Sequence, residues 1–101
     1  MILYTARRID AVEAQRIGLI NKMVSDEELN EEVLDLARTI ADNAPLSVAA
    51  SKLTINEMLK DESQRDMAVV KKMMETCFNS ADYKEGRTAF MEKRAPKWVG
   101  R

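Results

Sequence analysis

The residues best suited to chemistry lie near the C-terminal end, in the stretch SADYKEGRTAFMEKRAPKWVG, residues 80–100. Phe90 and Lys93 are three positions apart, and this spacing makes two side chains neighbours on one face of a helix. An aromatic ring beside an ammonium group can hold a flat base and a phosphate together. The alternative is that Phe90 anchors the core and Lys93 is a surface lysine. Spacing alone favours that alternative, because such pairs are common.

Other routes to catalysis are restricted by composition. The chain contains no histidine, so no Ser-His or Cys-His pair can form, and the commonest metal ligand is missing. We therefore expect neither catalytic residues nor a metal site. The lone Cys77 lies on the apolar face of a methionine-rich helix, which favours a buried structural thiol. The acidic run from Glu27 to Glu32 is typical of a solvated helix start.

Length and charge limit the function classes further. The 101 residues suit one small helical domain, and the net charge of -1 gives no overall attraction to nucleic acid. Basic residues do cluster near the end, but acidic residues are interleaved, so nucleic-acid binding is disfavoured. These basic residues are Lys84, Arg87, Lys93, Arg94, Lys97 and Arg101. A single cysteine indicates a reducing compartment, hence the cytoplasm. No apolar run or leader predicts a membrane partner.

The N-terminal third is expected to hold one short helix and one or two extended pieces. Asp10 and Glu13 have capping-box spacing, which predicts a helix over residues 11–17 with Gly18 as its left-handed cap. The stretch ILYT is apolar and β-prone, and residues 19–24 are predicted to be extended.

Longer helices are expected to follow. A capping box at Ser25 and Glu28 predicts a helix from Asp26 to about Asn43, and Pro45 opens the next helix, which ends near Leu59. A fourth helix covers about residues 64–78, and a fifth is capped by Ser80 or Asp82 and stops before Pro96. The residues expected to face inward are Leu29, Val33, Leu36, Ile40, Val48, Ile55, Leu59, Met67, Val70, Met74 and Cys77. The chain is thus predicted to be mostly α, with about five helices.

Gly86 falls inside the fifth predicted helix, where a glycine costs about 1 kcal/mol relative to alanine. Such a cost is tolerated where another segment or a ligand comes close to the backbone. We therefore expect a close approach at Gly86.

The same stretch resembles the C-terminal signature of the crotonase family, which includes the enoyl-CoA hydratases and isomerases. The matching positions are Ser80, Asp82, Glu85, Gly86, Ala89, Phe90, Glu92, Lys93, Arg94, Pro96, Trp98 and Gly100. Upstream, YTARRIDAVEAQRIGLINKMV is similar to a second family segment, although Ala6 stands where the family usually has glycine. LARTIADNAPLSVAASKLTINEML fits the family's helix pair around an Ala-Pro, so the resemblance covers essentially the whole chain.

The resemblance implies the C-terminal helical region of the crotonase fold. The family's N-terminal spiral of ββα turns supplies the oxyanion hole and the acid/base carboxylates, and these positions precede the start of this chain. The resemblance also implies that Phe90 and Lys93 contact the adenine and phosphate region of coenzyme A, with Arg94 a weaker phosphate contact. Coenzyme A enters as the thioester substrate, and no separate cofactor is expected.

Two functions therefore remain open. The chain is either the C-terminal portion of an enzyme of acyl-CoA metabolism, inactive by itself, or a helical oligomerisation and interaction module without catalysis. The second hypothesis expects exposed apolar faces, a homo-oligomer or association with a catalytic portion. The methionines expected on those faces are Met58, Met67, Met73 and Met74.

Overall fold

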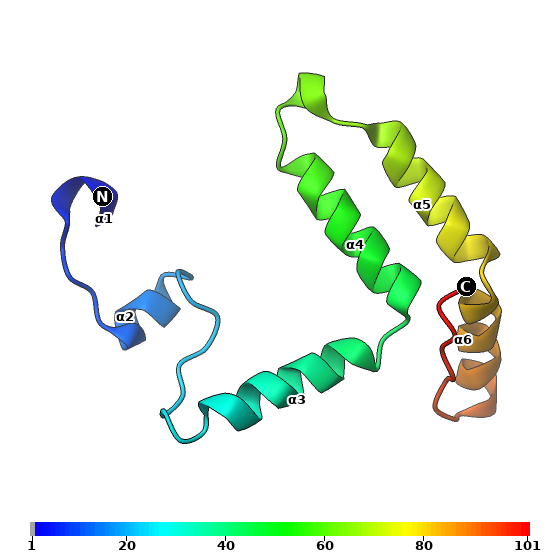
Figure 1. Cartoon of the computed structure of the whole chain (residues 1–101), viewed down its shortest axis with the longest axis horizontal. Helices are drawn as coiled ribbons and strands as arrows, with labels where there is room; N and C mark the ends of the chain where they lie inside the picture. The colour runs from blue at the N-terminus through cyan, green and yellow to red at the C-terminus, as the bar shows by residue number, and fades with distance from the viewer. Residues whose placement is uncertain (1) are drawn as a thin grey trace. The chain divides into compact units, whose positions relative to one another are not determined.

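The computed structural model describes residues 2–101, and within this range it contains six α-helices, one 3₁₀ turn and no strand (Figure 1). The elements in chain order are α1 (Ile2–Thr5), α2 (Ala11–Arg16), α3 (Leu29–Ala41), α4 (Pro45–Met58), η1 (Glu62–Gln64), α5 (Met67–Asn79) and α6 (Ala81–Glu92). The prediction of a mostly helical fold is confirmed.

Contacts group the chain into two compact units, Met1–Leu36 and Ala37–Arg101, and the boundary falls inside α3. The expectation of a single helical domain over residues 1–101 stays a prediction. Each unit is stabilised by its own local contacts, and each is described by itself below.

In the first unit, the caps of α2 form largely as predicted. The Asp10 carboxylate accepts a hydrogen bond from the Glu13 N–H at 2.8 Å, and Gly18 has the left-handed φ of +75°. The Glu13 side chain does not close the capping box. It binds the Arg7 guanidinium through two hydrogen bonds of 2.7 and 2.9 Å, and this pairing lowers the pKa of Glu13.

The predicted extended segments are wrong in this unit. ILYT forms α1, and residues 19–24 are turns and irregular chain rather than a strand. The reason is that backbone N–H groups of residues 19–24 donate hydrogen bonds to α2. The Leu19 N–H donates to the Ala14 carbonyl at 2.9 Å, and the Met23 N–H donates to the Gln15 side chain at 3.1 Å. Since α2 already satisfies these groups, a neighbouring strand is not required.

The start of α3 shows a complete capping box. The Glu28 N–H donates to Ser25 Oγ at 3.3 Å, and the Ser25 N–H donates back to Glu28 Oε2 at 3.4 Å. The helix itself begins at Leu29, three residues later than predicted, because residues 26–28 form a turn under this cap.

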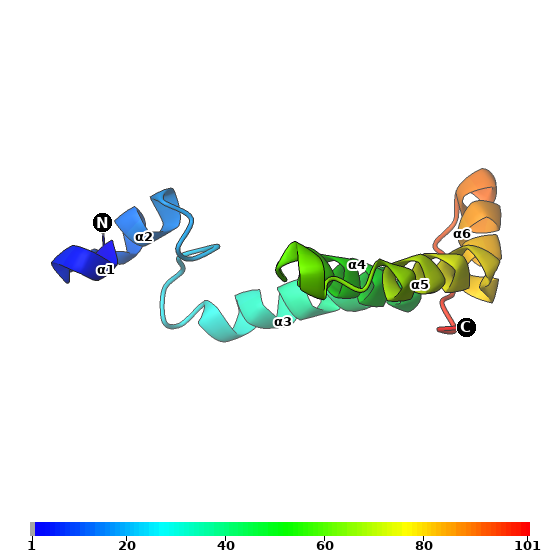
Figure 2. The same ribbon diagram turned by 90° about the horizontal axis from the view of Figure 1, so that it is seen from above.

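In the second unit, α4 and α5 lie side by side in both views and are joined by η1 (Figures 1 and 2). Pro45 is the first residue of α4, as predicted. The helix α5 begins at Met67 instead of Gln64, because Asp66 caps it and accepts hydrogen bonds from the Ala68 and Val69 N–H groups at 3.0 and 3.1 Å.

A buried carboxylate holds the α4–α5 turn together. Glu57 accepts hydrogen bonds from Lys60 Nζ at 2.6 Å and from the Asp66 N–H at 2.9 Å. These contacts lower the pKa of Glu57, with the Lys60 bond as the largest cause. One side chain thereby connects the end of α4 to the cap of α5.

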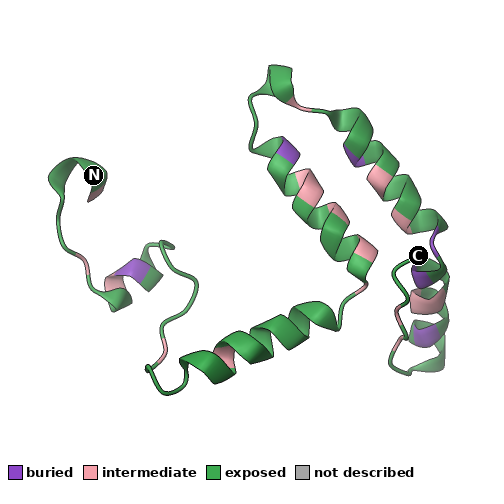
Figure 3. Ribbon diagram, viewed as in Figure 1, coloured by how far each residue is buried: buried purple, intermediate pink, exposed green. Residues whose placement is uncertain are grey.

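The described residues bury few apolar side chains (Figure 3). The buried ones are Ala14, Val70 and Ala89. The expectation that α3 and α4 face inward is wrong. Every expected inward residue on α3 and α4 is exposed, namely Leu29, Val33, Leu36, Ile40, Val48 and Ile55, and Leu59 beyond α4 is also exposed. The periodicity predicted the helices correctly, but burial also needs a packing partner, and α3 has no buried residue in this structure.

On α5, only Val70 of the predicted stripe is buried, while Met67 and Met74 are exposed. The predicted buried thiol is half-buried, and Cys77 Sγ donates to the Leu46 carbonyl on α4 at 3.3 Å. The thiol therefore contributes to the packing of α4 against α5.

Candidate functional site

The signature residues all lie at the N-cap of α6, on α6 or on the tail that follows it, residues 93–101. Ser80 is the N-cap of α6, and its Oγ accepts a hydrogen bond from the Tyr83 N–H at 2.9 Å. The same hydroxyl donates to the Cys77 carbonyl at 2.6 Å. Of the two cap candidates, the structure selects Ser80, so that Asp82 is available for another role.

Asp82 binds the tail to the start of α6. The residue is only 2% exposed, and its carboxylate accepts hydrogen bonds from the Val99 and Gly100 N–H groups at 2.7 and 2.9 Å. In the reverse direction, the Ala81 and Asp82 N–H groups donate to the Arg101 carbonyl at 2.7 and 3.2 Å. These four bonds bring the tail back along α6.

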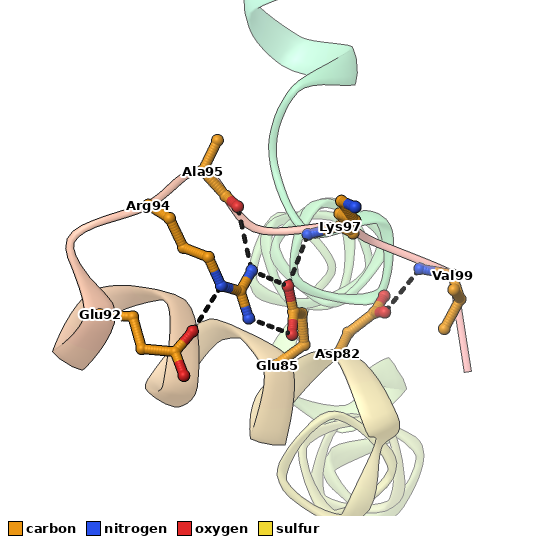
Figure 4. A network of polar contacts seen from close by, with 7 residues as sticks. All are labelled: Asp82, Glu85, Glu92, Arg94, Ala95, Lys97 and Val99. Carbon is orange, nitrogen blue, oxygen red and sulfur yellow. Dashed lines mark hydrogen bonds and ion pairs between the residues drawn. The ribbon is translucent and has the colours of Figure 1, made fainter.

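One turn further along α6, Glu85 holds the middle of the tail (Figure 4). Its two carboxylate oxygens accept hydrogen bonds from Arg94 Nη1 and Nη2 at 2.6 and 3.0 Å, and Oε1 also accepts from the Lys97 N–H at 2.8 Å. The Arg94 pairing, followed by the Lys97 hydrogen bond, lowers the pKa of Glu85 to about 2. The carboxylate is therefore ionised at neutral pH and is not suited to act as a general acid.

Gly86 makes the predicted close approach, and the partner is the chain itself. A Cβ atom placed on Gly86 would lie 3.1 Å from the Trp98 ring. The ring is fixed from its other edge, where Trp98 Nε1 donates to the Asp42 carbonyl at 2.8 Å. Glycine thus leaves the indole room to lie against the helix backbone.

The helix ends at Glu92, and Lys93 follows in the left-handed conformation, with φ +54° and ψ +40°. The Lys93 N–H donates to the Phe90 carbonyl at 3.2 Å, and the Arg94 N–H donates to the Ala89 carbonyl at 3.0 Å. This pair of bonds is the Schellman pattern of helix ends. Lys93 therefore lies beyond α6. The sequence suggested that Phe90 and Lys93 are two residues on one face of a helix, but only Phe90 is helical.

Phe90 and Lys93 are both at the surface. Phe90 is 82% exposed, so the interpretation of this ring as a core anchor is wrong for this chain. Lys93 is exposed too, and its side chain has no ion pair or hydrogen bond within the described part of the chain. An exposed ring and an unpaired ammonium group lie at the same end of α6, where a base and a phosphate could be bound.

Unlike Lys93, Arg94 has its side chain engaged in hydrogen bonds within the chain. Four of its N–H groups are already in hydrogen bonds, two with Glu85, one with Glu92 Oε2 at 2.6 Å and one with the Ala95 carbonyl at 3.1 Å. The two carboxylates raise the pKa of Arg94 above its already high ordinary value. The structure places this guanidinium among acceptors from its own chain.

Sequence reasoning missed what Asp82, Glu85 and Trp98 do together, which is to attach the tail to the rest of the second unit. The positions themselves were visible in the signature, but partners up to 56 residues apart cannot be paired from spacing alone. Within residues 2–101, no group of acidic, histidine or cysteine side chains could hold a metal ion. No helix in that range has the length and apolar character needed to cross a membrane.

The sequence model of the enoyl-CoA hydratase/isomerase family matches residues 1–101, and the chain belongs to this family. Crotonyl-CoA hydratase of Syntrophomonas wolfei is 42% identical over 100 residues, which cover 99% of this chain and 38% of the relative. Carnitinyl-CoA dehydratase of Salmonella typhi is 40% identical over 104 residues, covering 99% of this chain and 40% of the relative.

Solved structures agree on the fold. Enoyl-CoA hydratase from Bacillus anthracis superposes with a TM-score of 0.81 at 33% identity, covering 97% of this chain and 38% of that chain. A probable enoyl-CoA hydratase/isomerase from Mycobacterium abscessus gives a TM-score of 0.76 at 37% identity, covering 92% of this chain and 37% of that chain. This chain therefore spans about two fifths of the relatives' length, and it corresponds to their C-terminal part.

Proposed function

We propose that this chain forms the C-terminal helical region of an enzyme that acts on acyl-CoA thioesters, in fatty-acid or related acyl-CoA metabolism in the cytoplasm. The observation that carries the proposal is the family match over all 101 residues. The reaction is the addition of water to a 2-enoyl-CoA, or a related step through a thioester enolate. The relatives named above act on CoA thioesters by their names, which supports the same substrate class here.

Within that enzyme, the end of α6 contacts the nucleotide of coenzyme A. The Phe90 ring is exposed and flat, so it can stack on adenine, and base–aromatic stacking contributes about 1–3 kcal/mol per base. The unpaired Lys93 ammonium group follows three residues later and supplies a positive charge for a phosphate. Arg94 contributes less to direct contact, because most of its N–H groups already have partners.

The 101-residue chain alone is expected to be inactive. The described carboxylates on α6 are engaged, since Asp82 binds two tail amides and Glu85 binds Arg94 and Lys97. No histidine is available as an alternative acid or base. A spectrophotometric assay with crotonyl-CoA should therefore give no turnover by the pure chain. Turnover above the protein-free rate would contradict this expectation.

The nucleotide contact is tested by titrating coenzyme A into isotope-labelled chain and following backbone amide shifts. The proposal predicts saturable shifts centred on Phe90 and Lys93. Shifts that are absent at millimolar coenzyme A would contradict binding by this chain alone.

A second function, association without catalysis, is favoured by the exposed apolar stripe of α3. Its members are Leu29, Val33, Leu36 and Ile40, and α3 has no buried residue. The methionines Met58, Met67 and Met74 are also exposed, whereas Met73 is half-buried. Exposed apolar surface of this kind drives self-association or binding to a catalytic portion.

Light scattering should show a dimer or larger species, and Leu36→Glu should shift it toward monomer. A wild-type chain that stays monomeric at high concentration would contradict this function.

A further inference from the structure

The turn that carries Lys93 has an unusual backbone. A residue with a side chain in the left-handed region costs roughly 1–2 kcal/mol compared with the right-handed region, and glycine is the usual occupant at this place after a helix. Such a conformation persists only where the surrounding structure holds it. The contacts on either side of Lys93 therefore have to stabilise this conformation.

Besides the two Schellman hydrogen bonds, one ion-pair network flanks Lys93. Glu92, just before Lys93, accepts from Arg94 Nε at 2.6 Å, and Arg94, just after it, is bound through two hydrogen bonds by Glu85. The Lys97 N–H donates to the same Glu85 carboxylate at 2.8 Å. Figure 4 shows Glu85 at the centre, with the tail passing over it from Arg94 to Val99. The left-handed turn is thus flanked on one side by Glu92 of α6 and on the other by Arg94, which Glu85 and Glu92 of α6 bind.

The charges in this network argue against a phosphate on Arg94. Its single positive charge faces the two carboxylates of Glu85 and Glu92, so the local balance is negative. A phosphate would have to compete with both carboxylates for the same N–H groups. The Lys93 ammonium group, in contrast, has no acceptor within the described part of the chain.

We propose that Arg94 is a positioning residue rather than a phosphate ligand. Its ion pair with Glu85 holds the left-handed turn that presents Lys93, and thereby sets the affinity for the phosphates of coenzyme A. The affinity part of this inference rests on the function proposed above. The part that concerns the turn does not depend on it.

The discriminating substitution is Glu85→Gln. Glutamine has one acceptor oxygen and places an amide N–H₂ group against either Arg94 or the Lys97 N–H, so the network is broken while Arg94 keeps its charge. If Arg94 positions Lys93, then Glu85→Gln and Arg94→Gln both weaken coenzyme A binding by about fivefold or more, and Arg94→Lys is intermediate. If Arg94 binds phosphate, Glu85→Gln frees it and leaves binding unchanged or tighter.

The control is Glu57→Gln, which removes a carboxylate at the α4–α5 turn, away from the tail. It lowers stability without touching the Lys93 turn, so its coenzyme A affinity should match wild type. Circular dichroism confirms that each variant is folded. Weakening by Arg94→Gln alone, with Glu85→Gln binding as wild type, would overturn the proposal. So would equal weakening by Glu57→Gln, because it would make the effect one of general stability.

Amide hydrogen exchange supplies a second readout that needs no ligand. The Lys97 and Arg94 amides should exchange faster in both Glu85→Gln and Arg94→Gln than in wild type, while amides in α4 keep their rates. If the isolated wild-type chain binds no coenzyme A, the affinity part of the inference is overturned for this chain, and exchange alone decides the positioning role. Unchanged exchange at Lys97 and Arg94 in both variants would overturn it.

Discussion

The indole of Trp98 lies so close to the backbone of Gly86 that a methyl group on Gly86 would be 3.1 Å from the ring. The contact explains why a glycine is found inside α6. At its other edge the indole N–H donates a hydrogen bond to the Asp42 carbonyl, which also holds the tail in place. The tail that follows α6 is therefore held between the backbone of Gly86 and a residue 56 positions earlier in the sequence than Trp98.

The Gly86–Trp98 contact predicts opposite effects of Gly86→Ala in two backgrounds. In wild type, the new methyl group displaces the held indole and lowers the free energy of unfolding by about 1 kcal/mol. In a Trp98→Ala background the space is open, so helix propensity dominates and the same change stabilises by up to about 1 kcal/mol. Urea unfolding of the four proteins measures both effects. Stabilisation by Gly86→Ala in wild type would contradict the contact.

Asp82 on α6 is predicted to be the most sensitive of the polar residues that hold the tail. Asp82→Ala leaves the Val99 and Gly100 N–H groups without their acceptor, which should cost about 2–4 kcal/mol of unfolding free energy. The exposed Glu75 on α5 provides the matched control, and Glu75→Ala should change stability by less than about 0.5 kcal/mol. Equal stability losses for the two variants would argue against the tail attachment.

The Glu85–Arg94 pair predicts how stability depends on pH. The pKa of Glu85 is lowered in the folded chain from 4.5 to about 2. The pair therefore stabilises the fold fully above the unfolded value of 4.5, and this contribution is lost as the pH falls toward about 2. Unfolding free energies should decline more steeply over this range in wild type than in Glu85→Gln. Parallel curves for the two proteins would show that the pair contributes nothing.

Ala6 occupies a left-handed conformation, with φ +49°, at the position where the family usually has glycine. Ala6→Gly should therefore raise the free energy of unfolding by about 0.5–1 kcal/mol, because relief of the backbone cost exceeds the entropy lost by glycine. Ala49→Gly in the exposed middle of α4 is the opposite control and should destabilise by about 1 kcal/mol. Thermal unfolding compares the two. Destabilisation by both would contradict the left-handed turn.

Local signals in the sequence predicted local structure well. The caps at Asp10, Ser25 and Ser80 and the first-turn proline of α4 all form, because each depends on residues within one helical turn. The extended segment at residues 19–24 failed for a related reason. Its backbone groups bind α2, and no pattern of alternating residues reports on that alternative.

Non-local structure was predicted only in outline. Periodicity placed the apolar stripe of α3 correctly, but burial depends on which element covers it, and that stripe is exposed here. The glycine at position 86 predicted a close approach without identifying Trp98 as the partner. The family resemblance implied a weaker phosphate contact for Arg94, while the two carboxylates that bind it lie nine and two residues upstream in the chain.

The measurement that tests the central claim most directly is the equilibrium binding of coenzyme A to two matched double variants. Phe90→Ala with Lys93→Gln removes the proposed stacking ring and phosphate charge, whereas Met91→Ala with Lys84→Gln removes another exposed apolar residue and another exposed lysine, both on α6. The account predicts about tenfold or greater weakening for the first variant only, as expected for the loss of a stacked base. Equal affinities of the two variants would contradict a nucleotide contact at the end of α6.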